Sequence, residues 1–153
     1  MRVALVSDTH GLVRPEVAEA LEGAPLILHA GDVGKPAVLE ALEALAPVRA
    51  IRGNVDRGEW AERLPHDEVV EVEGCLVYLL HDRGELALDP SAAGAGFDVV
   101  VTGHSHRPVS EVRGGVLYVN PGSCGPRRFR LPISMAWLTV EAGKAPGVEF
   151  VTF

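Results

Sequence analysis

Short apolar runs alternate with amphipathic segments along the first third of the chain. The runs Arg2–Ser7, Leu26–His29 and Val48–Ile51 have the length of strands, and their near-continuous hydrophobicity is typical of strands buried on both faces. Between them, Pro15–Leu21 and Lys35–Leu45 carry apolar residues at helical spacing and a proline near their start, which predicts two helices. This β-α-β-α-β order predicts a parallel sheet with right-handed crossover connections.

The pattern changes from Glu68 onward, where strand-length runs follow one another with little helical periodicity between them. The predicted strands are Glu68–Val72, Cys75–Leu80, Asp98–Thr102, Val109–Val112, Val116–Val119, Ile133–Val140 and Val148–Phe153. Gly114-Gly115 predicts an antiparallel hairpin, and Ser91–Ala95 is a candidate for a short helix. Parallel units followed by such a meander predict two mixed sheets packed face to face with helices outside.

The length of 153 residues predicts a single domain, residues 1–153, and a hydrophobic content of 47% excludes a disordered chain. The longest apolar runs reach only strand length, whereas a membrane span needs roughly 20 apolar residues. The apolar run after Arg2 is too short for a signal peptide, because Asp8 follows at once. Two cysteines, Cys75 and Cys124, are too few for a disulfide framework. We therefore expect a cytoplasmic protein that does not bind membranes.

The net charge of −7 argues against nucleic acid as a partner, since duplex-binding surfaces carry an excess of basic residues. The one local basic cluster is Arg127-Arg128-Phe129-Arg130. We therefore expect a small-molecule partner, and the sequence leaves formation of a homo-oligomer open.

Candidate chemistry gathers directly behind the predicted strands. Seven oxygen and imidazole donors follow apolar runs, namely Asp8, His10, Asp32, Asn54, His81, His104 and His106. The carboxyl ends of parallel strands form the rim where open α/β sheets place ligands, so we expect these donors to meet there. Carboxylate, amide and imidazole ligands together suit a pair of divalent cations. The sequence thus predicts a two-metal phosphoesterase.

In two pairs of donors, the two members lie two residues apart in the sequence. In extended backbone such side chains point the same way, so Asp8 and His10 are predicted to bind one ion together. By the same argument His104 and His106 are predicted to lie on one side of the chain. Taken alone, Asp8 would suit a turn equally well, and His10 would suit an exposed surface.

The remaining donors each have a structural alternative. Asp32 follows a bend at Gly31 and can bridge two cations, or it can cap the second predicted helix. Asn54 can ligate a hard cation through its amide oxygen and donate to a phosphate oxygen, although Gly53-Asn54 is also a turn signal. His81 ends an apolar strand, where a lone histidine is usually structural.

Three further polar features are interpreted as parts of the framework. His29 lies within a strand and is expected to be packed and hydrogen-bonded, and Asp56 is expected to order its own loop. Asn120-Pro121-Gly122-Ser123 ends the predicted hairpin, either as a rigid turn or as a substrate contact.

Taken in order, these motifs resemble those of the calcineurin-like metallophosphoesterase superfamily. They are Asp8-Thr9-His10, Gly31-Asp32, Gly53-Asn54-Val55-Asp56, His81, Gly103-His104-Ser105-His106 and Asn120-Pro121-Gly122-Ser123. The resemblance runs from residue 3 to about residue 125, and the short chain and the last motif are similar to the small prokaryotic YfcE-like phosphodiesterase branch. It implies an α/β fold, a four-layer α/β/β/α sandwich of two mixed β-sheets flanked by helices.

The resemblance also implies how the ligands divide. One ion would be held by Asp8, His10, Asp32 and His106. The second would be held by Asp32, Asn54, His81 and His104, so that Asp32 bridges the two. Two such divalent ions, Mn²⁺ first with Fe, Ni or Zn as alternatives, would acidify a bridging water for in-line attack on phosphorus. We assign catalytic roles to Asn54 and His104, and substrate contacts to Asn54 and Arg107.

Two departures from the family pattern bear on the activity. Many members carry a histidine, a candidate proton donor, where this chain has Val55, so efficient cleavage of poor leaving groups is not expected. The strand-end histidine is commonly followed by glycine, whereas Asp82 and Arg83 follow His81 here, so that loop is expected to sit differently.

The first hypothesis is therefore a phosphodiesterase for a small phosphodiester or nucleotide-like substrate. One alternative is a phosphomonoesterase or nucleotide pyrophosphohydrolase on the same metals. Another is a non-catalytic scaffold like the retromer subunit that shares this fold, which predicts degraded metal ligands.

Overall fold

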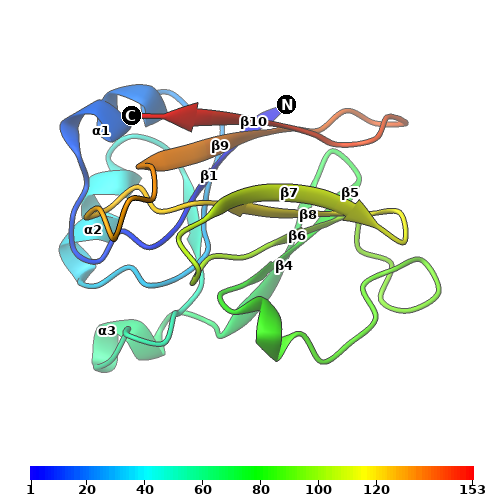
Figure 1. The fold of residues 1–153 in the computed structure, drawn as a ribbon, viewed down its shortest axis with the longest axis horizontal. Helices are drawn as coiled ribbons and strands as arrows, with labels where there is room; N and C mark the ends of the chain where they lie inside the picture. The colour runs from blue at the N-terminus through cyan, green and yellow to red at the C-terminus, as the bar shows by residue number, and fades with distance from the viewer.

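A computed structural model describes all residues from Met1 to Phe153, which form two five-stranded sheets stacked on each other (Figure 1). The first sheet has the strand order β10-β9-β1-β2-β3, and the second has the order β4-β5-β6-β8-β7. Each sheet combines parallel with antiparallel pairs. The two mixed sheets expected from the sequence are therefore confirmed.

The first sheet is built around the predicted β-α-β-α-β unit. Its strands are β1 (Arg2–Val6), β2 (Ile27–His29), β3 (Val48–Ala50), β9 (Ser134–Thr139) and β10 (Gly147–Thr152). The first three run parallel and are joined by α1 (Pro15–Leu21) and α2 (Pro36–Glu43). Each helix begins at a proline, whose missing N–H is harmless in the first turn. β9 and β10 extend the sheet as antiparallel strands beside β1.

The second sheet has a parallel centre between two antiparallel edges. Its strands are β4 (Asp67–Val72), β5 (Cys75–Leu80), β6 (Val99–Val101), β7 (Pro108–Arg113) and β8 (Val116–Pro121). β5, β6 and β8 run parallel, while β4 pairs with β5 and β7 with β8 as hairpins. The predicted hairpin turn is confirmed: Gly114 and Gly115 have φ of 56° and 78°, as a two-residue turn of the primed type needs.

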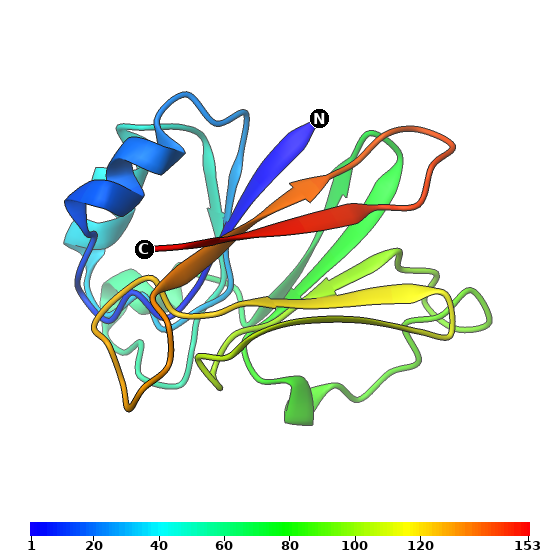
Figure 2. The ribbon, with the colours of Figure 1, turned by 45° about the horizontal axis from the view of Figure 1, so that its top comes forward.

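The main core lies between the two sheets, where side chains such as Leu5 and Leu28 of the first sheet pack with Leu79 and Val101 of the second. The other face of the first sheet is covered by α1 and α2 (Figure 2). Leu21 of α1 is fully buried in that second cluster. Burial on both faces explains the near-continuous apolar runs of β1 and β2, whereas Arg49 of the edge strand β3 is exposed.

The outer face of the second sheet is covered mainly by the segment between β5 and β6. Leu86 and Phe97 of this segment pack against Tyr78 and its neighbours, and the rings of Tyr78 and Phe97 stack with centroids 4.8 Å apart. Its only helical turn is the 3-10 helix η1 (Arg83–Glu85). The fourth layer of the sandwich is therefore mostly irregular chain.

The short helix considered for Ser91–Ala95 is wrong. The backbone N–H groups of Gly94 and Gly96 both donate to Ser91 O, which closes isolated turns. The two glycines disfavour continuation into a helix because they lose the most backbone freedom there. A four-residue helix, α3 (Glu59–Glu62), was not predicted, since so short a segment shows no periodicity. No helix in the structure is both long and apolar enough to span a membrane.

Candidate metal centre

The predicted donors lie where the carboxyl ends of strands from both sheets meet. Asp8 and His10 follow β1 and Asp32 follows β2, both in the first sheet. His81 follows β5, and His104 and His106 follow β6, in the second sheet. Six of these donors form two groups, and within each group the ligand atoms lie within 4.8 Å of one another. The ligand-binding edge that we expected at the strand ends of one sheet is thus formed by strand ends of both sheets.

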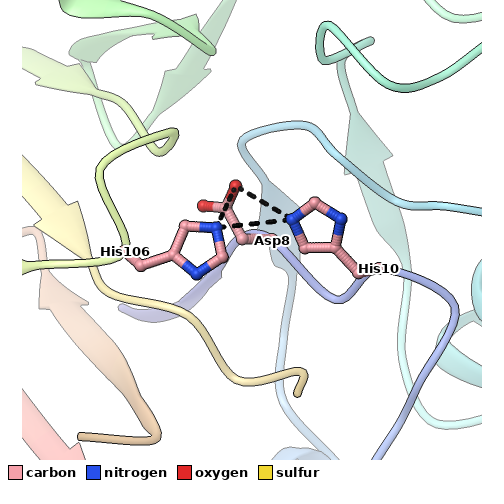
Figure 3. Close-up of side chains that lie close together, drawn as sticks. All are labelled: Asp8, His10 and His106. Atoms are coloured by element: carbon pink, nitrogen blue, oxygen red, sulfur yellow. Dashed lines mark hydrogen bonds and ion pairs between the residues drawn. The ribbon is translucent and has the colours of Figure 1, made fainter. Parts of the chain in front are cut away.

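The first group consists of Asp8, His10 and His106, which point toward one another from two loops (Figure 3). Asp8 Oδ1 lies 3.4 Å from His106 Nε2 and 3.8 Å from His10 Nε2, and the two imidazole nitrogens are 3.4 Å apart. Two ligands that each lie about 2.0–2.2 Å from one ion are themselves roughly 3–3.5 Å apart. These separations therefore suit a shared cation.

The second group consists of Asp32, His81 and His104. Asp32 Oδ2 lies 3.2 Å from His81 Nε2. On the open side of the group, His104 Nδ1 lies 3.2 Å from Asn54 Oδ1, which brings the predicted amide ligand to this group. Here too the donor set of carboxylate, imidazole and amide suits a divalent cation.

Asp32 connects the two groups. Its Oδ2 atom lies 3.2 Å from His81 Nε2 of the second group and 3.6 Å from His10 Nε2 of the first. One carboxylate oxygen thus faces donors from both sides. This is the position that the sequence interpretation assigned to a bridging ligand.

The backbone at these donors is unusual. Seven non-glycine residues of the chain have positive φ, and five of them belong to the two groups: Asp8, His10, Asp32, His104 and His106. Such conformations cost of order 1–3 kcal/mol each and concentrate at functional sites. The expectation that both two-residue pairs sit on extended backbone is therefore wrong. His104 and His106 in fact point into different groups.

Hydrogen bonds orient the donor atoms. The imidazole of His81 bonds through Nδ1 to Ala30 O at 2.7 Å, which leaves Nε2 facing the site. Asp8 Oδ2 accepts from the backbone N–H of His104 at 3.1 Å, and Asp32 Oδ1 accepts from that of Val55 at 3.1 Å. The remaining carboxylate oxygens, Asp8 Oδ1 and Asp32 Oδ2, are those that face the imidazoles. Hydrogen bonds to the atoms of a ligand that do not face the metal fix its tautomer and its orientation.

Unpartnered atoms provide an independent test of whether a cation fits. Only three buried side-chain nitrogen or oxygen atoms in the chain lack a hydrogen-bond partner: Asp8 Oδ1, His81 Nε2 and His106 Nδ1. All three belong to the two groups, and such atoms are costly unless something satisfies them. A cation would satisfy the first two, which face the cluster. The residues present therefore fit two divalent ions.

Burial and mutual charge shift the protonation of the donors. Burial raises the pKa of Asp8 to about 6 and, together with the charge of Arg128, lowers that of His106 to about 4. Burial also lowers the pKa of His81, but the carboxylates of Asp32 and Asp8 outweigh it and raise that pKa. Conversely, burial raises the pKa of Asp32, but His81, the backbone N–H of Val55 and His10 together outweigh burial and lower that pKa. The lowered pKa of His106 favours the neutral imidazole that binds metal, whereas the raised pKa values of Asp8 and His81 favour protonated forms from which an ion would displace the proton.

Two residues interpreted as structural do hold the donor loops. His29 is fully buried, accepts from Gly31 N through Nδ1 at 3.1 Å, and lies 2.9 Å from Thr9 Oγ1 through Nε2. Asp56 accepts from the backbone N–H groups of Val33, Gly34 and Gly53. His29 thus ties the loop of Asp8 to that of Asp32, and Asp56 ties the loop of Asp32 to that of Asn54. Both interpretations are confirmed.

The segment Asn120-Pro121-Gly122-Ser123 forms the end of β8 and the residues after it, not a turn, and it supports the site. Asn120 donates through Nδ2 to Gly103 O and Ser105 Oγ and accepts from Gly122 N. Ser123 donates to Asp8 O. Because Asn120 is buried and these bonds occupy both ends of its amide, its contacts hold the loop that carries His104 and His106.

The structure adds residues that sequence reasoning missed. A cavity of about 280 Å³ beside the second group is lined by Arg52, Arg57 and His66, together with Asn54 and His104. The two arginines flank the Gly53–Asp56 motif directly, and this adjacency was the available signal. Arg107, expected to touch substrate, is exposed and does not line this cavity; its role stays a prediction.

Comparison with known proteins places these features in context. A model of the calcineurin-like phosphoesterase superfamily domain matches residues 1–143. A probable metallophosphoesterase of Methanothermobacter thermautotrophicus is 37% identical over 133 residues, which cover 80% of this chain and 77% of that relative. Phosphodiesterase YfcE of Escherichia coli is 32% identical over 148 residues, covering 80% of this chain and 79% of YfcE. The solved structure of an archaeal phosphodiesterase shares the fold over 100% of both chains, with a TM-score of 0.80 and 24% identity.

Proposed function

Because the chain belongs to the calcineurin-like phosphoesterase superfamily, we propose that it is a phosphodiesterase that works with two divalent metal ions. The observation that carries the proposal is the pair of donor groups, which Asp32 connects and which contain every unpartnered buried side-chain nitrogen or oxygen of the chain. We propose Mn²⁺ as the first candidate, because imidazoles mixed with carboxylates suit transition-metal ions.

The first ion would be held by Asp8, His10, Asp32 and His106. The second would be held by Asp32, Asn54, His81 and His104. When bound, two such ions lower the pKa of a water molecule and neutralise charge on the phosphoryl oxygens. In the reaction, the water oxygen forms a new bond to phosphorus and the ester P–O bond breaks, which releases the alcohol.

The residues on the open side position the phosphoryl group. Asn54 is exposed, and its Oδ1 faces His104, so its NH₂ is free to donate to a phosphoryl oxygen. The imidazole of His104 is 48% exposed beside it and can contact the same group. Both therefore keep the catalytic roles proposed for them.

Val55 favours activated esters as substrates. Its side chain is 43% exposed and its backbone N–H bonds to Asp32, so it lies beside the site, yet an aliphatic group cannot donate a proton. A general acid typically contributes roughly 10²–10⁴-fold, mainly to basic leaving groups. We therefore propose aryl or similarly activated phosphodiesters as better substrates than alkyl phosphomonoesters. The scaffold alternative predicts degraded ligands, whereas all seven donors are present here.

Asp32→Ala tests this proposal. The variant should stay folded, lose hydrolysis of bis(p-nitrophenyl) phosphate and bind at most one Mn²⁺ per chain, because Asp32 Oδ2 lies 3.2 Å from His81 Nε2, whereas the other nearby carboxylate oxygen, Asp8 Oδ1, lies 3.8 Å away. Activity should be measured on aryl phosphodiesters, cyclic nucleotides and aryl phosphomonoesters, and metal content by mass spectrometry. Asp89→Ala, at an exposed loop carboxylate outside both groups, is the matched control. Full activity of Asp32→Ala with two ions bound would refute the two-metal proposal.

A further inference from the structure

The cavity beside the second group is lined only by polar residues and glycine. It measures about 280 Å³, and no hydrophobic side chain lines it. One side consists of Asn54, His81 and His104, and the other carries Arg52, Arg57 and His66. Pockets for whole ligands occupy roughly 300–1,000 Å³. This cavity therefore has room for one polar part of a substrate whose reacting phosphoryl group lies at the donor groups.

The carboxylates around the cavity already have partners. Asp56 accepts from three backbone N–H groups. Glu85 lies 3.0 Å from the imidazole of His66, and Asp82 accepts from Gly84 N while its other oxygen lies 4.0 Å from His104 Nε2. Each of the three carboxylates thus has at least one contact within the protein.

The two guanidinium groups have no such partners. Arg49 and Arg83, which do not line the cavity, form ion pairs with Glu68 and Glu111. The side chains of Arg52 and Arg57 form no ion pair or hydrogen bond with the chain. A guanidinium carries five donors in a planar fork that matches a phosphate. The unused donors of this cavity therefore favour an anion.

We propose that Arg52 and Arg57 form a subsite for a second phosphate, so that the preferred substrate is a phosphodiester whose alcohol part carries a further phosphate group. This inference rests on the proposed phosphodiesterase function. The reacting phosphoryl group occupies the donor groups next to Asn54 and His104, and the second phosphate occupies the cavity against the two arginines. An apolar ester group would meet no hydrophobic residue here, because only polar residues and glycine line the cavity.

Two substrates that differ by one phosphate test the proposal. Thymidine 5′-(p-nitrophenyl phosphate) and its 3′-phosphorylated form should be compared with Mn²⁺-loaded protein. Both possible aromatic products, nitrophenol and nitrophenyl phosphate, should be counted, since either ester bond can break. The 3′-phosphorylated form should show a KM at least about tenfold lower, as charge-assisted hydrogen bonds imply. The double variant Arg52→Gln/Arg57→Gln should bring the ratio of the two KM values close to one.

Arg63→Gln is the matched control, since Arg63 is exposed and lies outside the cavity; it should keep the wild-type ratio. Equal KM values for the two substrates in the wild type would overturn the proposal. A double variant that raises the KM of both substrates by the same factor would also overturn the proposal, because the arginines would then bind the reacting phosphoryl group.

A binding measurement separates this inference from the proposed function. Calorimetry with Mn²⁺-loaded protein should show thymidine 3′,5′-bisphosphate binding at least about tenfold more tightly than thymidine 5′-monophosphate. If neither ester is hydrolysed, the proposed function fails. The difference in affinity between the bisphosphate and the monophosphate still shows whether the phosphate subsite exists. Equal affinities would overturn the subsite even in an active enzyme.

Discussion

His29 shows how one buried side chain serves the site without touching it. Since Gly31 N donates to its Nδ1, the ring must carry its proton on Nε2 and donate to Thr9 Oγ1, which in turn donates to Val33 O. Every polar atom in this chain of bonds is thereby satisfied. Burial lowers the pKa of His29 to about 3, so the ring is neutral at physiological pH.

The lowered pKa of His29 predicts a loss of stability in acid. Unfolded histidine takes up its proton near pH 6.5 and folded His29 only near pH 3, so the unfolded state binds more protons between these values. Stability from this group is complete above pH 6.5 and is lost as the pH falls through that window. Between pH 7 and 5 the loss should be about 2 kcal/mol. Asp8, with its pKa raised to about 6, acts in the opposite direction over part of this range.

Comparison with His29→Gln isolates this effect. The free energy of unfolding of each metal-free protein should be measured with urea at pH 7 and at pH 5. Its decrease from pH 7 to pH 5 should be smaller by about 2 kcal/mol in the variant than in the wild type. The opposing contribution of Asp8 is common to both proteins and cancels. An unchanged pH dependence would mean that His29 does not stay neutral in the fold.

The sequence predicted that these donor residues would lie together, but it did not predict their backbone conformation. Asp8 and His10 donate from their backbone N–H groups to Gly31 O and Asp32 O, so the loop after β1 pairs with the loop after β2. This pairing holds both residues at positive φ. Such a conformation depends on a contact between segments more than 20 residues apart, which local sequence does not encode.

At the scale of elements, the strand-to-loop junctions are packed too tightly for larger residues. A Cβ added to Gly103, which precedes His104, would lie 2.0 Å from Ser7 Oγ and 2.7 Å from Asp8 Oδ2. The loop after β6 thus approaches the end of β1 so closely that only glycine fits. This contact between the two sheets brings His106 to Asp8.

Gly103→Ala should therefore damage both stability and metal binding. The variant should unfold with a free energy lower by about 1–3 kcal/mol, as overpacked sites do, and should retain less Mn²⁺. Gly147→Ala is the matched control, because a Cβ there meets nothing within 4 Å, and it should change stability by less than about 0.5 kcal/mol. Denaturant titration and metal analysis of both variants would check this. Similar behaviour of the two variants would contradict the close approach.

Element prediction succeeded where periodicity was long enough to read. α1 begins and ends where the apolar spacing and Pro15 predict, because seven residues with one buried face leave a clear pattern. η1 has only three residues, so its position depends on Asp82 accepting from Gly84 N rather than on any repeat. The position of the segment that covers the outer face of the second sheet likewise depends on single contacts, such as the stacking of Phe97 on Tyr78.

At the scale of the whole molecule, the hydrophobic core and the candidate metal centre are built from different residues. The core between the sheets and the cluster under α1 and α2 contain 17 and 12 buried apolar residues, none of them a donor of the site. Removal of metal would leave these contacts intact. The two donor groups, by contrast, bring the carboxylates of Asp8 and Asp32 together at the junction of the sheets, where a cation would offset their charge.

The last prediction follows from this separation. Chelation with EDTA should give an inactive but folded protein, and added Mn²⁺ should restore activity. Ions that bind only the folded state stabilise it by about 2.7 kcal/mol at a concentration of 100 Kd. For a domain of this size that raises Tm by about 5–10 °C. Calorimetric scans with EDTA and with Mn²⁺ should show this shift, and Asp32→Ala should lose most of it. Unfolding on chelation would show that the metals are structural, and an unchanged Tm would show that these donors bind none.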